Sequence, residues 1–183
     1  MAALAEMPGR PHPNRLFAPM IDSPMHTQPS ARFLELRIPP VVLVILVAIL
    51  TWAGGTHLPQ FNFQIRFQLF VGWIMGFWGI VVCALGVLEF KRAKTTVNPT
   101  KPQSSSALVK SGIYRRPRNP MYLGFLLILM GSAILAANLV AFLALPAFVL
   151  YMNQFQIKPE ERALTSIFGD EFRAYYSSVR RWI

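Results

Sequence analysis

Residues 39–57 read PPVVLVILVAILTWAGGTH, and this run contains no Lys, Arg, Asp or Glu. A helix needs about 20 apolar residues to cross the hydrocarbon core of a bilayer, so the run is long enough to span one. The whole chain follows the same pattern, because 54% of its 183 residues are hydrophobic and the apolar residues are collected into long runs. The sequence therefore predicts an integral membrane protein.

Three further runs complete the predicted membrane domain. Residues 67–90 are almost uncharged, and residues 120–137 and 139–157 meet at Asn138, where they predict a tight transmembrane hairpin. We therefore expect an all-α, polytopic membrane protein with about four transmembrane helices and a cytoplasmic C-terminal helical segment. Residues 39–183 are expected to form a single domain.

Four glycines lie at helical spacing in the second run, namely Gly72, Gly76, Gly79 and Gly86. Small residues allow helices to approach closely in lipid, so we interpret these glycines as packing positions. The single cysteine, Cys83, lies in the middle of the same run in apolar surroundings. A reactive thiol needs a polar, electropositive site, so this cysteine is also interpreted as a packing residue.

The segments outside the four runs are polar. Residues 1–38 hold six prolines and no apolar core segment, which is typical of a disordered cytoplasmic tail rather than a secretory signal. Residues 91–119 are basic and rich in Pro and Ser, and they are too long for a tight connection, which predicts a functional or disordered segment. Residues 159–182 carry apolar positions at helical spacing and predict C-terminal helices with a break at Gly169-Asp170.

Positive charge decides the expected orientation. With four spans, 17 of the 18 Lys and Arg residues fall on one side of the bilayer, and only Arg66 falls on the other. The positive-inside rule makes the crowded side cytoplasmic, so we expect both termini and residues 91–119 there, in the inner membrane of a bacterium. Basic loops then account for the net charge of +10, and no nucleic-acid partner is expected.

The hairpin also indicates where a site could lie. It leaves the cytoplasmic face at Pro120 and returns near Pro159, so two polar clusters meet at one depth: residues 112–124 and the pair Glu160 and Glu161. Each cluster also has a purely structural interpretation as a helix start, because Asn before Pro and early acidic residues both suit a helix N-terminus. The three histidines are too scattered in the sequence for a metal site.

Taken in order, the clusters form a longer pattern. It consists of Gly-Ile-Tyr at 112–114, Arg-Asn-Pro-Met-Tyr-Leu-Gly at 118–124, the apolar hairpin, Glu-Glu at 160–161 and Phe-Gly at 168–169. The pattern and its spacing resemble the isoprenylcysteine carboxyl methyltransferase and phospholipid methyltransferase superfamily of membrane enzymes. The resemblance covers roughly residues 97–182, close to half of the chain.

The resemblance implies methyl transfer from S-adenosylmethionine (SAM), with S-adenosylhomocysteine as the product, at the cytoplasmic surface of the membrane. The acceptor would be a lipophilic, membrane-partitioned molecule, as in the isoprenylcysteine carboxyl methyltransferases. In the family, the segment before the Gly-x-Tyr helps to hold the cofactor. Carried over residue by residue, the implied cofactor-binding positions are Ser106, Ala107, Leu108, Val109, Tyr114, Arg118, Asn119, Pro120, Tyr122 and Glu160.

The sequence departs from the superfamily pattern at two positions. The family's His is Asn119 here, which keeps hydrogen bonding but cannot titrate. In the prenylcysteine enzymes an Arg four residues before the first glutamate helps to hold the substrate carboxylate, and here that position is Gln156. A neutral amide cannot replace a bidentate guanidinium, so we expect an acceptor that does not depend on this Arg. No catalytic base is assigned.

Other functions stay open at this stage. A phospholipid N-methyltransferase would share the fold and the cofactor. A non-enzymatic membrane scaffold would account for the glycine-lined spans but not for the paired motifs. A reductase like the membrane sterol reductases shares part of this architecture, but those chains are much longer and bind a nicotinamide dinucleotide. Cofactor binding separates these classes.

Overall fold

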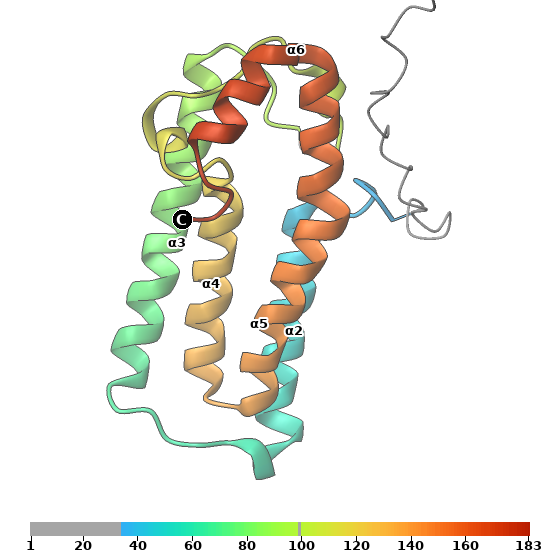
Figure 1. Ribbon diagram of the computed structural model, residues 1–183. Coiled ribbons are helices and arrows are strands. Elements are labelled where there is room, and N and C mark those ends of the chain that lie inside the picture. The colour runs from blue at the N-terminus through green and yellow to red at the C-terminus, as the bar shows by residue number, and fades with distance from the viewer. Residues whose placement is uncertain (1–33, 99) are drawn as a thin grey trace, which may run out of the picture.

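The computed structural model describes residues 34–98 and 100–183, and in this part the chain folds into a helical bundle (Figure 1). The four predicted runs form α2 (Pro40–His57), α3 (Gln68–Arg92), α4 (Pro120–Ala136) and α5 (Leu139–Tyr151). The last helix, α6 (Lys158–Ser178), bends across one end of the bundle. The predicted all-α fold is confirmed.

Helix lengths agree with a membrane protein. Helices α2 and α3, and the continuous helix from Leu139 to Ser178, are long and apolar enough to cross a bilayer. Helix α4 has 17 residues and is therefore about 26 Å long, which is at the lower limit for a span. The chain is an integral membrane protein, and its described residues form three long apolar helices and a fourth, shorter one.

Close backbone contacts join α3 to α4. A Cβ atom added to Gly79 would lie 2.6 Å from the Gly124 carbonyl oxygen, and one added to Gly131 would lie 2.6 Å from the Gly72 carbonyl oxygen. Side chains larger than hydrogen would push the two helices apart, so the interpretation of Gly72, Gly79 and Gly86 as packing positions is confirmed. Gly76 differs, because a Cβ there would meet no atom within 4 Å.

Asn138 closes the hairpin between α4 and α5. Its Oδ1 accepts a hydrogen bond from the Val140 N–H, which caps α5, and its Nδ2 donates to the Gly54 and Leu58 carbonyls and to Asn62 Oδ1. The side chain is fully buried. One residue therefore caps a helix and fastens the end of α2 to the hairpin.

The chain passes from α5 into α6 without a break. A π-helical turn, η4 (Met152–Ile157), joins the two helices, so Pro159 does not begin a separate helix as its sequence context suggested. Proline has no N–H to pair with the carbonyl four residues earlier, that of Phe155. The Leu36 N–H donates to this carbonyl at 3.0 Å. The described end of the predicted tail, residues 34–38, is thus held against the bundle, and residues 1–33 lie outside the described residues.

The predicted polar segment folds over the same end of the bundle as α6 (Figure 1). It contains two short 3-10 turns, η2 (Pro102–Ser104) and η3 (Gly112–Arg115). Helix α6 is kinked at Gly169, where φ is 52° and ψ is −122°, as the sequence predicted. We call this end, which carries residues 93–98 and 100–119 and α6, the basic end of the bundle.

Candidate active site at the basic end

A cavity of about 300 Å³ lies at the basic end, between α6, the loop that precedes η3, and the ends of α2, α3 and α4. Its volume is at the lower end of the range for small-molecule sites. Most of its lining is apolar, with a few polar groups. Eight of the ten positions implied by the resemblance line this cavity: Ala107, Leu108, Val109, Tyr114, Arg118, Asn119, Tyr122 and Glu160.

The other two positions, Ser106 and Pro120, do not line the cavity but lie next to residues that do. Pro120 is fully buried as the first residue of α4. The Ser106 N–H donates to Thr95 Oγ1 at 3.0 Å, and the Ala107 N–H donates to the same oxygen at 3.4 Å. Thr95 therefore fixes the path of the loop that forms one wall of the cavity, a role that no sequence pattern had indicated.

Glu160 presents the carboxylate of the cavity. Its Oε2 accepts a hydrogen bond from the Tyr122 hydroxyl at 2.9 Å, and no Lys, Arg or His of the described residues forms an ion pair with it. The residue lies in α6, beyond the apolar stretch that ends at Ile157. Burial raises the pKa of its carboxyl to about 7, the Tyr122 hydrogen bond opposes that rise, and the negative charge of Glu161 adds to it.

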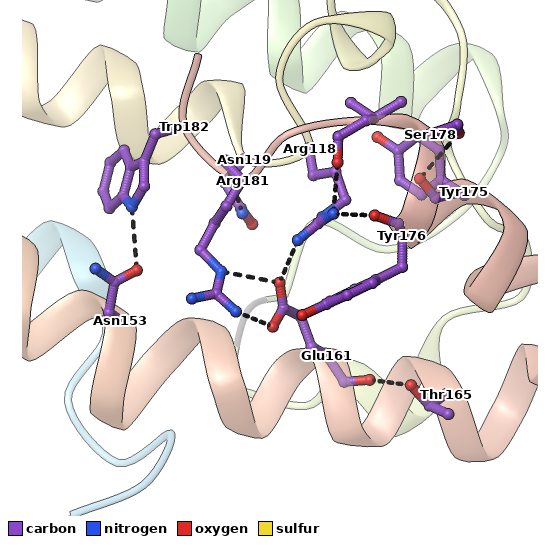
Figure 2. A network of polar contacts seen from close by, with 11 residues as sticks. Arg118, Asn119, Asn153, Glu161, Thr165, Tyr175, Tyr176, Ser178, Arg181 and Trp182 are labelled. Carbon is purple, nitrogen blue, oxygen red and sulfur yellow. Dashed lines mark hydrogen bonds and ion pairs between the residues drawn. The ribbon is translucent and has the colours of Figure 1, made fainter.

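Glu161, its neighbour, has the opposite surroundings (Figure 2). Arg181 binds both carboxylate oxygens, through Nη2 at 2.6 Å and Nε at 3.1 Å, and Arg118 Nη2 lies 3.0 Å from Oε1. Two guanidinium groups therefore satisfy one carboxylate. Both glutamates line the cavity, but they differ in their partners, because Glu161 is paired with two arginines and Glu160 with none.

Arg118 and Asn119 both contact the C-terminal segment, residues 179–183. Arg118 donates through Nη1 to the Tyr176 and Val179 carbonyls, and its guanidinium carbon lies 4.0 Å from the centre of the Tyr176 ring. Asn119 Nδ2 donates to the Arg181 carbonyl at 3.1 Å. These two side chains line the cavity and also hold the returning chain in place (Figure 2).

The Gly-Ile-Tyr turn is fixed by α3 on one side. Ser111 Oγ donates to Glu89 Oε2 at 2.5 Å, and Gly112 has a φ of +55°, where an added Cβ would collide with the Glu89 carboxylate. Glycine is required there for both its backbone angle and its size. The turn places the Tyr114 ring in the cavity wall, beside the Phe90 ring at 5.5 Å.

Helix α6 fixes the same turn on the other side. The buried Tyr175 hydroxyl donates to the Tyr114 carbonyl at 2.7 Å. Glu89, Ser111 and Tyr175 thus determine where the Tyr114 ring lies.

Gln156 lies one side chain away from the cavity. It is buried in the π-helical turn, and its Nε2 donates to the Tyr122 hydroxyl at 3.4 Å. The structure thus links the predicted substrate position to Glu160 through Tyr122, although Gln156 itself does not line the cavity. Arg181 was missed by the sequence reasoning, because its partners are brought to it only by the fold.

Comparison with known proteins places this geometry in a family. A family model described as phospholipid methyltransferase matches residues 67–171, more than half of the chain. The chain belongs to this family. The matched region contains α3, the polar segment, the hairpin and the first part of α6, and so includes all ten cofactor-binding positions implied by the resemblance. Of the cavity lining, Pro39, Pro40, Val41, Phe172 and Tyr175 lie outside it.

Curated relatives of this family member share parts of its length. An uncharacterized protein of Haemophilus influenzae is 49% identical over 63 residues, which are 34% of this chain and all of the relative. A probable protein-S-isoprenylcysteine O-methyltransferase of Oryza sativa subsp. indica is 32% identical over 116 residues, 62% of this chain and 59% of the relative. Methanethiol S-methyltransferase 1 of Bradyrhizobium diazoefficiens is 26% identical over 114 residues, 60% of this chain and 38% of the relative.

The alignments with the two named methyltransferases cover only part of each relative, so the relatives' activities do not transfer directly to this chain. The chain spans 59% of the rice relative and 38% of the Bradyrhizobium relative. The names of both relatives are those of methyltransferases, which implies a methyl donor in the family. No solved structure matches the chain.

Proposed function

We propose that this protein transfers a methyl group from SAM to a lipophilic acceptor in the membrane, in the manner of the isoprenylcysteine carboxyl methyltransferases. One observation carries the proposal: three separate segments converge on a single cavity whose carboxylate, Glu160, has no cationic partner among the described residues. A half-buried carboxylate that has one hydrogen-bond donor and no cation favours a ligand that supplies positive charge or further donors.

The residues present fit SAM. The ligand has an ammonium group and ribose hydroxyls, and the Glu160 carboxylate can accept hydrogen bonds from either. Ala107, Leu108 and Val109 offer an apolar slot for an adenine ring. When bound, SAM supplies a methyl group on a sulfonium that is already an excellent leaving group.

The protein's own contribution is positioning. Holding donor and acceptor in reactive geometry replaces a bimolecular encounter with an effectively unimolecular step. Glu160 and Tyr122 would bind polar groups of the donor, and Tyr114 and Phe172, which line the same cavity, would help to enclose it. An apolar enclosure excludes water and favours a step in which charge is cancelled.

A lipophilic acceptor is supported by the side of the cavity that faces the bundle. Val41, Phe90, Met121 and Phe125, at the ends of three membrane helices, form this wall. The family relatives act on different acceptors, since one is named for isoprenylcysteine and another for methanethiol. Gln156 provides no positive charge here, so we propose an acceptor that is neutral or anchored through a different headgroup.

A methylation assay tests the proposal. Purified protein in lipid nanodiscs is incubated with methyl-labelled SAM and fractionated lipid extracts, and labelled products are identified by mass. The expected result is a labelled lipophilic product that disappears with Glu160→Gln. A parent protein that binds neither SAM nor S-adenosylhomocysteine while keeping its helical fold would refute the methyltransferase assignment.

We also propose that the basic end faces the cytoplasm, supported by the 17-to-1 division of positive charge. Single cysteines in a Cys83→Ala background report the orientation. A membrane-impermeant reagent added outside should label a cysteine at exposed Gln60 but not one at exposed Gln103 or Ser177. Gln60 is a better probe than Asn62, whose side chain bonds to Gly55 and Asn138. Labelling of position 103 from outside would reverse the proposed orientation.

A further inference from the structure

Arg181 binds Glu161, a residue of the site, although Arg181 itself does not line the cavity. The C-terminal segment returns from α6 across the bundle, where the Arg118 N–H donates to the Arg180 carbonyl at 2.9 Å and Trp182 Nε1 donates to Asn153 Oδ1 at 3.0 Å. Between these two hydrogen-bonded residues, Arg181 donates hydrogen bonds to both carboxylate oxygens of Glu161 (Figure 2). The Arg181 guanidinium is thus delivered to the residue next to the cavity carboxylate.

We propose that Arg181 is a positioning residue for the donor site, acting by neutralising Glu161 so that Glu160 can be ionised and bind the ammonium or ribose of SAM. The proposal rests on the proposed function above. Adjacent carboxylates repel each other, and two like charges at one site disfavour the second ionisation. Arg118 and Arg181 together cancel the charge of Glu161, which leaves Glu160 as the anion that the ligand meets.

The groups around Glu160 support these separate roles, in which Glu160 binds the ligand and the arginines neutralise Glu161. Tyr122 of α4 donates to it, Gln156 of the π-helical turn contacts Tyr122, and Tyr114 of η3 and Arg118 line the same cavity. Cavity residues contributed by the loop before η3, by α2 and by α3 are all uncharged. Burial and the Tyr122 hydrogen bond also act on the ionisation of Glu160, and among the charged groups of the described chain Glu161, with its two arginines, is the one that affects it.

Arg118 cannot do this alone. Its guanidinium also serves the Tyr176 and Val179 carbonyls and reaches only one oxygen of Glu161. Arg181 supplies the other oxygen and a second bond to the first, in the bidentate geometry that suits a carboxylate. Removing Arg181 would leave Glu161 partly buried and incompletely neutralised next to Glu160.

The test measures the pH dependence of S-adenosylhomocysteine binding by calorimetry on the full chain in nanodiscs. This probe carries the amino group and ribose of SAM but no transferable methyl group. Arg181→Gln should move the midpoint of the affinity profile upward by about 0.5–1 pH unit, which weakens binding about two- to fivefold at pH 7. Arg181→Lys, which keeps the charge, should bring the midpoint back towards that of the parent.

Two further variants separate charge from packing. Arg180→Gln removes the same charge from an exposed neighbour whose side chain forms no ion pair in the described structure, and it should leave the midpoint unchanged. Glu161→Gln should lower the midpoint, and Glu161→Gln with Arg181→Gln should return it to or below the parent value. If Arg181→Gln does not fold, Glu161→Gln alone still decides the matter.

Midpoints that stay fixed in Arg181→Gln and Glu161→Gln, with affinity reduced equally at every pH, would overturn the inference and leave Arg181 with a packing role. That result would not affect the proposed function, which is judged by whether the parent binds the probe. A parent that binds, with midpoints that shift in opposite directions in the two single variants, supports both.

Discussion

The Tyr122 hydroxyl lies 2.9 Å from a carboxylate oxygen of Glu160, and this hydrogen bond joins the first turn of α4 to the first turn of α6. The two residues are 38 positions apart and are brought together because the α4–α5 hairpin returns the chain to the level from which it left. The same phenol accepts a hydrogen bond from Gln156. It therefore connects Glu160, the proposed SAM-binding residue, to Gln156, the proposed position for the methyl acceptor.

Replacing the Glu160 carboxylate should weaken SAM binding. Glu160→Gln keeps the size of the side chain but loses a charged hydrogen-bond acceptor, which is worth about 1.5–3 kcal/mol. We expect affinity for SAM to fall by about 10- to 150-fold in calorimetry at pH 8. Glu171→Gln, on the exposed side of the same helix, is the matched control and should bind like the parent. Equal affinity in parent and Glu160→Gln would show that the carboxylate does not contact the ligand.

Binding of SAM should also depend on pH through Glu160. Its pKa is raised to about 7, and the ionised form is the one that accepts from the ligand, so affinity should be constant above about pH 7.5 and fall as the pH drops through 7. Tyr122→Phe removes the hydrogen bond that lowers this pKa and should move the fall to higher pH. Tyr151→Phe is the control, because the buried Tyr151 hydroxyl has no partner in the described structure. A profile that is flat from pH 5.5 to 8 would contradict the assignment.

The turn before Tyr114 offers a test of how the cavity wall is held. Gly112→Ala introduces both a positive-φ alanine and a collision with Glu89, whereas Gly169→Ala introduces a positive-φ alanine with no atom within 4 Å. Overpacking typically costs about 1–3 kcal/mol, so Gly112→Ala should unfold at a lower temperature than Gly169→Ala. It should also bind SAM more weakly. Equal melting temperatures for the two variants would mean that the Glu89 contact relaxes freely.

Acceptor choice is predicted from Gln156. A buried substrate carboxylate needs a cation, and none is available at this position, so turnover of a farnesylcysteine analogue should be weak in the parent. Gln156→Arg should improve it relative to a lipophilic amine or thiol. Gln154→Arg places the same charge two residues away, beside Lys158, and should not help. Efficient parent turnover of the farnesylcysteine analogue, unchanged or reduced in Gln156→Arg, would refute this view of the acceptor.

Sequence patterns predicted the elements better than the contacts between their ends. Four apolar runs were enough to give the four helices, and the hairpin was enough to bring residues 112–124 to Glu160. The Arg181–Glu161 pair could not be predicted, because it forms across the Gly169 kink and a non-helical return of the chain. Thr95 and Glu89 were also missed, since each stabilises a loop through a single side chain and leaves no periodic signal.

The π-helical turn between α5 and α6 makes the orientation of α6 depend on the number of residues that join the two helices. Each residue of an α-helix advances the side chains by about 100°, and a π turn accommodates the equivalent of one extra residue. Inserting a further residue between Tyr151 and Pro159 would exceed what this turn accommodates and would rotate all of α6 by about that angle. Glu160 would then leave Tyr122, and Glu161 would leave both arginines, in a single step. Natural variation here should therefore consist of substitutions, or of the loss of the one extra residue of the π turn, while further insertions should be absent from active relatives.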